Sequence, residues 1–541
     1  MRVRLVIVCA LVLASAGAGI GPAGGQSATT AQGLNHDDPT VYAVYPDPVA
    51  SGDRGEFVVL SVPDGTTLGR YSLTDGDSVA PLPNRSVAGR VAVTSDPATV
   101  RNLTDYPVIG IGTRLALANS GEAVSLRRDG QTVSRVRYGD TEEGDLGVVR
   151  GSTIHWRPLG STDFPVVDGE GGQVRAFALP DATGPPLAPI RNATDRVFLA
   201  GYTLSSDRVA RALLAAKDRG ATVTVLLEGE PVGERTRAEA RTLDRLTEAG
   251  IEVRLLSGPR ARYRYHHAKY AVADDRAVVL TENWKPAGTG GQDSRGWGVI
   301  TSDSAVVSGL ADTFRADAGW RDTVRWEQYR AGRTFGLAEP TEGSYPTRFD
   351  PTSVPVDRTE LLVAPDNAQR AILRDIEGAE ESVDVVQPTV GGWDEPLVRA
   401  LRRAASRGVE VRLLLSSAWY VREENRQTVS RVREWADRTG APLSAGVADP
   451  DDRFGKIHAK GAIIDGDQVL VGSLNWNEQA ATSNREVVLA LHGSEIADYF
   501  SRVFDADWSG GRMELPVGLG AAVAGVAAVG ALAARRIRVA A

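Results

Sequence analysis

Two stretches decide the fold: YHHAKYAVADDRAVVLTENW at residues 265–284 and KIHAKGAIIDGDQVLVGSLNW at residues 456–476. Each holds a histidine, one residue, a lysine, an apolar run, an acidic turn and a second run that ends in Asn-Trp. The chain has only five lysines in 541 residues, so a lysine kept twice beside a histidine indicates a chemical need. Side chains two apart on a strand share a face, so each His–Lys pair is predicted to point one way.

The sequence around these stretches is also repeated. Residues 195–230 and 381–417 each read as strand, helix, strand, with helical apolar spacing and Arg-Gly at the helix end. The offset between the halves drifts only from 185 residues (Pro180 to Pro365) to 191 residues (His267 to His458). This regularity predicts a duplicated α/β unit with lobes at 175–335 and 355–508, joined by 336–358.

The polar residues of each hairpin are predicted to gather at one spot and to act on a phosphate. A neutral imidazole is a nucleophile, an imidazolium is an acid, and a lysine ammonium binds phosphate oxygens. Asparagine and hydroxyl groups add hydrogen bonds to charge that develops on those oxygens. Two such sets, related by a pseudo-twofold axis, place histidines on opposite sides of one phosphorus. No metal or other cofactor is expected, because the sequence shows no carboxylate cluster to hold a metal.

These residues resemble the phospholipase D superfamily and its His-x-Lys-(x)4-Asp-(x)6-Gly-Ser signature, which the second stretch matches in full. The resemblance spans about 175–508. It implies a two-lobed α/β/α fold with the site at the lobe interface, a phosphohistidine intermediate and no cofactor. It also implies His267 as nucleophile and His458 as general acid. The implied site residues are His267, Lys269, Asp274, Asn283, His458, Lys460, Asp465, Ser473, Asn475 and Glu486.

The first half departs from this pattern. The superfamily places a glutamate after the motif to orient the histidine, and SNREVVL supplies Glu486 in the second half. The first half reads SRGWGVI, which has no glutamate, and Leu-Thr-Glu replaces Gly-Ser. Glu282 and Asp293 are the candidates for orienting His267. An inactive site that binds without turnover is the alternative interpretation of these departures.

The N-terminal region is predicted to be an immunoglobulin-like β-sandwich over 36–150. Short alternating runs at 55–62, 87–94, 114–119 and 123–140 read as strands, with a hairpin turn at Asp129-Gly130. The stretches RYSLTDGDS (70–78) and LALANSGEAVSLRRDGQTVSRVRYGD (115–140) resemble the lamin-tail domain. That resemblance implies a binding or spacing module.

Both termini are predicted to be targeting segments. Residues 1–25 read as a signal peptide, with two arginines, an apolar run and small residues. Leu515 to Ala534 is a stretch of twenty uncharged residues, about 30 Å as a helix, followed by three arginines. The positive-inside rule puts that end in the cytoplasm. The chain is therefore expected to be a single-pass cell-membrane protein with extracellular catalytic domains.

The expected partner is a phosphodiester substrate, either a phospholipid or a nucleic acid. Membrane proximity favours phospholipid. The stretch RARYRYHH (260–267) favours nucleic acid, since a strand there would carry arginines on one face and tyrosines on the other. His266 is expected to face outward.

Hydrolysis ranks first, and phosphatidyl transfer, as in cardiolipin synthases, ranks lower because those enzymes usually have N-terminal membrane helices. A surface binding protein with an inactive site is the remaining alternative. Both motifs lie in one chain, so a monomeric catalytic unit is expected.

Overall fold

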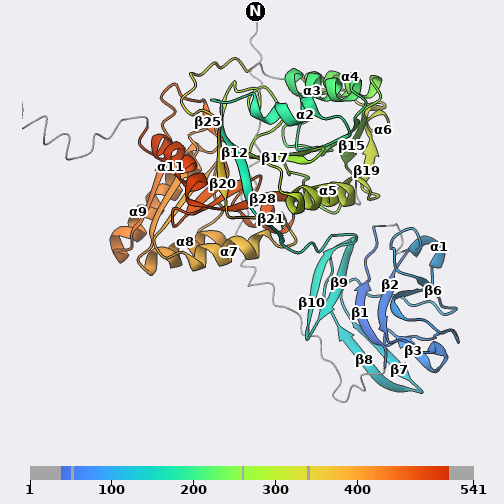
Figure 1. Ribbon diagram of the computed structural model, residues 1–541. Coiled ribbons are helices and arrows are strands. Elements are labelled where there is room, and N and C mark those ends of the chain that lie inside the picture. The colour runs from blue at the N-terminus through green and yellow to red at the C-terminus, as the bar shows by residue number, and fades with distance from the viewer. Residues whose placement is uncertain (1–37, 50–53, 259–260, 338–340, 511–541) are drawn as a thin grey trace, which may run out of the picture. The chain divides into compact units, whose positions relative to one another are not determined.

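The computed structural model describes residues 38–49, 54–258, 261–337 and 341–510 (Figure 1). The chain divides into two compact units, residues 1–161 and 162–541. The predicted signal peptide (1–25) and transmembrane helix (515–534) fall outside the described residues. Within the described ranges, every helix is too short or too polar to cross a bilayer.

The first unit is built from two sheets that share a core. One has the order β10-β9-β1-β2-β5-β6 and the other the order β4-β3-β7-β8. Val58 and Leu60 of the larger sheet pack with Leu73 and Leu126 of the smaller one. The elements are β1 (Thr40–Tyr45), β2 (Phe57–Val62), β3 (Tyr71–Thr74), β4 (Val79–Pro81), β5 (Gly89–Thr94), α1 (Pro97–Val100), β6 (Val108–Gly110), β7 (Ala123–Arg128), β8 (Gln131–Arg137), β9 (Asp145–Arg150) and β10 (Thr153–Pro158).

The β-rich character predicted for this region is confirmed, with one error. The hairpin turn at Asp129-Gly130 is present, and both residues have positive φ angles of 49° and 85°. The predicted strand at 114–119 is wrong, because this segment forms no strand. Leu115 and Leu117 are nevertheless buried in the core, so their alternation reflects packing by an irregular segment.

The second unit contains two large mixed sheets. The first has the order β19-β15-β14-β13-β16-β17-β18-β12-β20 and the second the order β11-β21-β28-β27-β26-β22-β23-β24. The strands of the first are β12 (Gly172–Leu179), β13 (Arg196–Gly201), β14 (Thr222–Glu228), β15 (Glu252–Leu256), β16 (Tyr270–Ala273), β17 (Arg276–Leu280), β18 (Ser294–Thr301), β19 (Thr323–Arg325) and β20 (Thr352–Val356). Those of the second are β11 (Val167–Gly169), β21 (Arg358–Ala364), β22 (Ser382–Gln387), β23 (Glu410–Leu415), β24 (Leu443–Val447), β26 (Gly461–Ile464), β27 (Gln468–Gly472) and β28 (Glu486–His492).

Helices cover both faces of each sheet, which confirms duplicated α/β lobes (Figure 1). The outer helices of the first lobe are α2 (Ala188–Asn192), α3 (Asp207–Asp218), α4 (Arg237–Glu248) and α6 (Trp326–Arg330). Those of the second lobe are α7 (Ala368–Gly378), α8 (Pro396–Ser406), α9 (Arg422–Thr439) and α10 (Glu478–Thr482). The remaining two, α5 (Ser304–Ala318) and α11 (Ser494–Trp508), lie in a central core that both sheets share.

The lobes also exchange strands. β11 precedes the first lobe in the chain but pairs with β21 of the second, whereas β20 precedes the second lobe but pairs with β12 of the first. The short strand β25 (Lys456–Ile457) pairs with β18 of the first lobe. Main-chain pairing across the interface therefore positions the segment that leads into His458.

Candidate active site

Two equivalent hairpins carry the His–Lys pairs. Lys269 and Lys460 each begin a hairpin, β16–β17 or β26–β27, and each is nearly fully buried. Lys269 Nζ donates to the carbonyl of His267 at 2.6 Å, and Lys460 Nζ donates to that of His458 at 2.7 Å. The same bond in both halves fixes each lysine beside its histidine. Lys460 Nζ also donates to the carbonyl of Thr281 at 3.5 Å, and each ammonium keeps at least one further hydrogen for an anion.

Each histidine is held by the backbone of the opposite lobe. His267 N donates to the carbonyl of Arg485 at 2.9 Å, and His458 N donates to the carbonyl of Arg295 at 2.9 Å. Both arginine side chains are fully buried and form cross-lobe ion pairs. Arg485 lies 2.9 Å from Asp317 of α5, and Arg295 lies 2.8 Å from Asp507 of α11. Two symmetric pairs thus fix the lobe interface directly behind the histidines.

The carboxylate that contacts His267 comes from the second lobe. His267 Nδ1 lies 2.9 Å from Glu486 Oε1 and 3.0 Å from Oε2. Asn484 donates to the same carboxylate at 3.1 Å. The expectation that Glu486 serves the histidine of its own motif is therefore wrong, because the interface crosses the partners. Burial opposes ionisation of Glu486, but His267 and Lys269 hold its pKa below the usual value.

Glu282 occupies the corresponding place beside the second histidine. Its Oε2 lies 3.2 Å from His458 Nδ1, and its side chain is buried. Glu282 was one of the two residues that the sequence offered for His267, so its true partner is again the other histidine. Asp293, the second of those residues, instead pairs with Lys456 at 2.8 Å.

A glycine makes the position of Glu282 possible. The hydroxyl of Thr281 accepts from the N–H of Trp297, and the hydroxyl of Ser473 accepts from the N–H of Val487 in the same way. The residues that precede these two N–H groups are Gly296 and Glu486, so Gly296 is the equivalent of Glu486. A Cβ added at Gly296 would lie 2.7 Å from Glu282 Oε1 and closer still to its Cγ. In the first lobe the carboxylate therefore comes from Glu282, just after the end of β17. Its side chain occupies the space that the missing side chain of Gly296 leaves open.

Four of the five lysines converge on this site. Lys269, Lys285, Lys456 and Lys460 all act electrostatically on Glu282. Burial is nevertheless the larger influence and raises the pKa of Glu282 to about 7. Burial also lowers the pKa of Lys460 to about 8. Lys285 was not among the predicted site residues, although the rarity of lysine in this chain was a usable signal.

The two imidazoles are almost enclosed, with side-chain exposures of 12% for His267 and 17% for His458. Burial lowers the pKa of His267 to about 4, against the opposing influence of Glu486. Burial, followed by Lys460 and Lys269, lowers the pKa of His458 well below its usual value. The site is therefore a largely buried cluster of lysines and carboxylates that favours neutral imidazoles until an anion enters.

The structure places Asp274 and Asp465 away from the histidines, so their expected place in the catalytic group is wrong. Both lie in the hairpin turns with positive φ angles of 52° and 51°. Asp274 accepts from the backbone N–H groups of residues 194–196, and Asp465 accepts from those of residues 380–382. Each carboxylate joins a hairpin to the start of the neighbouring strand.

The hydroxyl and amide residues divide between structural and site positions. Ser473 is fully buried and bonds to the backbone of Val487, so its expected hydrogen bond to phosphate is not supported. Asn475 is partly exposed beside the second hairpin. Asn283 is buried, and its Oδ1 lacks a partner among the described residues. An orphaned buried polar atom at this place is consistent with a polar ligand.

The predicted basic stripe before His267 is not formed, although Arg264 is exposed. Arg262 is buried in an ion pair with Asp322 at 2.8 Å, and Tyr263 is buried as well. His266 is also fully buried, 3.6 Å from Asp317, and does not face outward. The segment is an irregular connection between β15 and β16 of the first lobe, so strand alternation does not apply to it.

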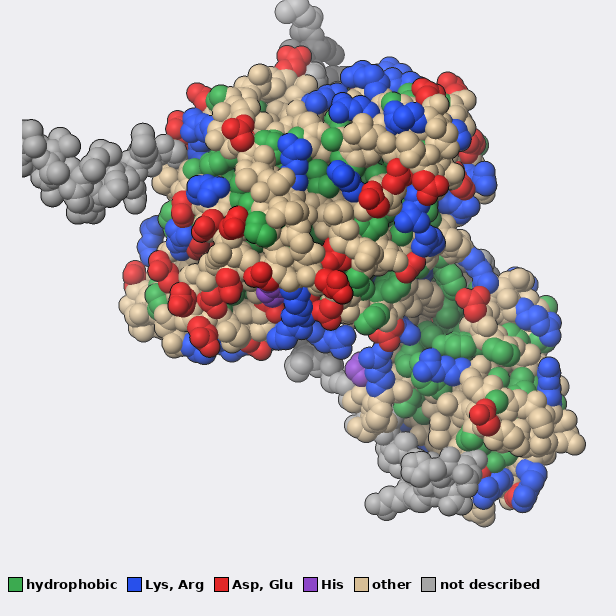
Figure 2. All heavy atoms as spheres, viewed as in Figure 1, with side chains coloured by type: hydrophobic (Ala, Val, Ile, Leu, Met, Phe, Trp, Pro, Cys, Tyr) green, Lys and Arg blue, Asp and Glu red, His purple; other side chains and the backbone are tan. Residues whose placement is uncertain are grey.

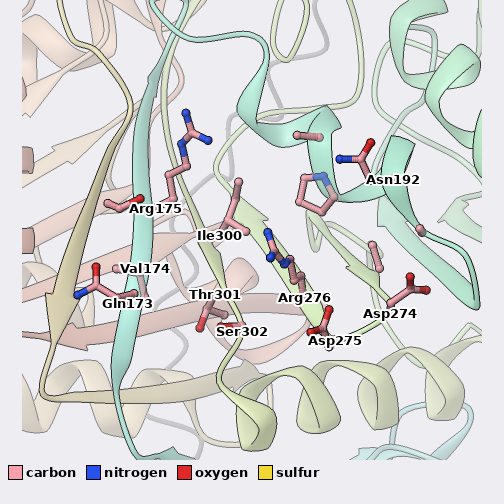
Figure 3. A pocket seen from close by; sticks show the side chains of 15 residues that line it. Gln173, Val174, Arg175, Asn192, Asp274, Asp275, Arg276, Ile300, Thr301 and Ser302 are labelled. Atoms are coloured by element: carbon pink, nitrogen blue, oxygen red, sulfur yellow. The ribbon is translucent and has the colours of Figure 1, made fainter.

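A polar cavity of about 520 Å³ lies at the other end of the first hairpin (Figure 3). Asp274 and Asp275 of the turn between β16 and β17 line it, together with Arg276 of β17 and Arg175 of β12. Four strand residues of β16 separate this turn from Lys269, about 13 Å of strand. The cavity is therefore separate from the histidine site.

A family model described as "Cardiolipin synthase, PLD-like domain" matches residues 187–318 and 372–508. The two matches cover the two lobes and include both His–Lys pairs.

Curated proteins give a consistent result at low identity. A mitochondrial cardiolipin hydrolase of Xenopus tropicalis is 34% identical over 113 residues, which cover 21% of this chain and 48% of that protein. A cardiolipin synthase A of Serratia proteamaculans is 25% identical over 373 residues, or 62% of this chain and 71% of that protein. The chain thus spans about half the length of the first of these relatives.

Among solved structures, a phosphatidylserine synthase of Haemophilus influenzae matches 64% of this chain and 88% of its own chain, with 13% identity and a TM-score of 0.47. The family match rests on the sequence of both lobes. The chain therefore carries two PLD-like domains, and with them the duplicated His-x-Lys site of the phospholipase D superfamily.

Proposed function

We propose that this chain cleaves phosphodiester bonds in phospholipids by nucleophilic attack of His267, with His458 as general acid. One observation carries the proposal. Two nearly enclosed imidazoles, each paired with a buried carboxylate of the opposite lobe, lie among four of the five lysines of the chain.

The assignment of roles follows from the two carboxylates. Glu486 has a lowered pKa and His267 has a pKa of about 4. Above about pH 4 the imidazole of His267 is therefore neutral and can act as a nucleophile. Glu282 has a pKa of about 7 while that of His458 lies far lower, so this pair holds one shared proton up to about pH 7. The first pair suits a nucleophile and the second suits an acid.

The reaction then has two steps. His267 Nε2 attacks phosphorus, the bond to the leaving oxygen breaks, and that oxygen takes the proton of the His458–Glu282 pair. In the second step, His458 accepts a proton from water, the water oxygen attacks phosphorus, and the bond to His267 breaks. Lys269 and Lys460 neutralise the phosphoryl oxygens throughout.

Three considerations favour phospholipid over nucleic acid. The similar curated proteins act on or make cardiolipin, as their names state. The arginine–tyrosine stripe that favoured nucleic acid is not formed. On the face of the second unit drawn in Figure 2, basic and acidic side chains are interspersed, whereas a nucleic-acid surface gathers basic ones.

Phosphatidyl transfer is the second candidate, because one similar protein is a cardiolipin synthase. The first step is the same, and an alcohol replaces water in the second.

We further propose that the chain is held at the cell membrane by residues 515–534, with its catalytic lobes outside the cell. The lamin-tail-like region, 36–150, would serve there as a spacing or binding module. These proposals rest on the sequence patterns alone.

The test is hydrolysis of an aryl phosphodiester by the purified chain in excess EDTA, beside His458→Asn. Turnover should survive EDTA and be lost in the variant. His492→Asn is the matched control, since His492 also contacts a glutamate, Glu360 at 3.1 Å, but outside the site. It should retain turnover. Absence of turnover with both water and an added alcohol as acceptor would favour the binding-protein alternative. Phosphatidylglycerol vesicles and single-stranded DNA then discriminate between the substrate classes.

A further inference from the structure

Large apolar side chains that remain exposed are unevenly distributed over the described residues. Only five qualify: Val79, Val232, Leu337, Trp419 and Tyr420. Trp419 is 85% exposed and Val232 is 75% exposed. Exposed apolar side chains that gather in one place indicate an interaction surface.

Three of the five lie on two equivalent loops. Val232 is on the β14–α4 loop (residues 229–236), and Trp419 and Tyr420 are on the β23–α9 loop (residues 416–421). Each loop follows the second parallel strand of its lobe, β14 or β23, so the duplication relates them. Leu337 is close to the first loop, because its neighbour Gly336 bridges to Thr236.

Both loops reach the mouth of the histidine site. The N–H of Val232 donates to the hydroxyl of Tyr202 at 2.6 Å, and the Tyr202 ring packs edge-on against His267 with centroids 4.9 Å apart. On the other side, the Tyr420 ring lies 5.8 Å from Lys456 Nζ, and Lys456 pairs with Asp293 at 2.8 Å. Lys456 itself is two residues before His458 in the chain. One exposed tip therefore stands beside each histidine.

We infer that these two tips form a bilayer-docking surface, which inserts Trp419, Tyr420 and Val232 into the headgroup region while a lipid phosphate enters between them. This inference rests on the proposed function and adds the way in which the substrate is reached. Tryptophan and tyrosine favour the boundary between headgroups and acyl chains, where an apolar ring and a polar edge are both accommodated. A nearly enclosed site also requires that the lipid be lifted towards it.

Charge does not drive this docking. The β23–α9 loop has no charged residue in 416–421, and the β14–α4 loop exposes Glu230 and Glu234. A nucleic acid would find no cation on the β23–α9 loop, and the two carboxylates of the β14–α4 loop add no attraction to an anionic surface. The apolar tips therefore specify a lipid surface, and their binding should change little between low and high salt.

The experiment compares substrates in two physical states with the full-length chain. Trp419→Ala/Val232→Ser should cleave long-chain phosphatidylglycerol in vesicles about tenfold more slowly than wild type. It should cleave monomeric dihexanoyl phosphatidylglycerol at the wild-type rate. Val79→Ser, an exposed valine of the N-terminal unit, is the matched control and should change neither rate. An equal loss on both substrates would overturn the inference.

A second measurement is independent of turnover. Brominated lipids quench tryptophans that enter a bilayer, so wild-type fluorescence should contain a quenched component that Trp419→Phe removes. If quenching occurs but no phosphodiester is cleaved, docking stands and the proposed function fails. If cleavage occurs with identical quenching in wild type and Trp419→Phe, the function stands and docking fails. A change from dimer to monomer in Trp419→Ala without quenching would instead make the surface a contact between copies, and would also overturn the inference.

Discussion

Relocating one carboxylate tests how the first lobe orients the opposite histidine. Glu282 contacts His458 at 3.2 Å from a position that the second half gives to Leu474, while Gly296 occupies the position that the second half gives to Glu486. The double variant Glu282→Leu/Gly296→Glu therefore rebuilds the first half on the plan of the second. Leu474 is itself buried, so leucine suits this environment.

The expected magnitudes follow from the geometry. Glu282→Leu removes the buried carboxyl group that shares a proton with His458, worth about 1.5–3 kcal/mol, which is about 10- to 150-fold in kcat/KM. Gly296→Glu alone should be worse, because its side chain overlaps Glu282 and places two carboxylates together. The double variant removes both problems and should recover to within about tenfold of wild type.

The assay is kcat/KM for an aryl phosphodiester across wild type, both single variants and the double variant. Circular dichroism and a denaturation curve establish that each variant folds. Glu282→Gln serves as the control that keeps shape without charge, and it should lose about as much as Glu282→Leu. A double variant no better than the product of the two singles would refute the reasoning, since independent effects multiply.

The remaining predictions concern pH and the lobe interface. The pH profile of kcat/KM should rise through about pH 4, where His267 loses its proton, and fall above about pH 7, where the His458–Glu282 pair loses the proton it shares. In Glu282→Gln the falling limb should move to lower pH, because the pKa of His458 itself is far lower; an unmoved limb would contradict the assignment. Asp317→Asn should lower the free energy of unfolding by about 3–5 kcal/mol, because it leaves Arg485 buried with a weakened partner. The control is Asp312→Asn on the same helix, which affects only an exposed pair with Arg315 and should cost less than about 1 kcal/mol. Equal urea midpoints for the two would contradict the structural account. Asp274→Asn should lower stability without changing the pH limits, because its carboxylate accepts from the backbone N–H groups of residues 194–196 and from the Thr194 hydroxyl, all remote from the histidines; shifted limits would show that it acts at the site.

The duplicated architecture was predictable because its signals are local. Helical periodicity, the Arg-Gly helix ends and the spacing of His267 and His458 all repeat within each half, so comparing the halves exposes the lobes. The lysine beside each histidine was predictable because the pair repeats in both halves, although neither pair lies within a strand: β16 begins at Tyr270 and β26 at Gly461.

The crossing of partners was not predictable from either half. Glu486 follows the second motif in sequence, but main-chain pairing brings Arg485 beside His267 and carries the glutamate across the interface. The role of Glu282 depends on the missing side chain at Gly296, a steric fact that appears only when both strand ends are placed together. Asp274 and Asp465 were misplaced because a carboxylate at a fixed spacing reads the same whether it serves a turn or a reaction.

The most direct test of the central claim is to identify the histidine that carries the phosphoryl group. An aryl leaving group needs little acid assistance, so His458→Asn should form the intermediate yet hydrolyse it slowly, because the base for water is gone. The account predicts one equivalent of aryl alcohol in a burst, a phosphoryl adduct on His267 by mass spectrometry after rapid quench, and no burst in His267→Asn. An adduct on His458 in the wild type, or a burst that survives in His267→Asn, would contradict it.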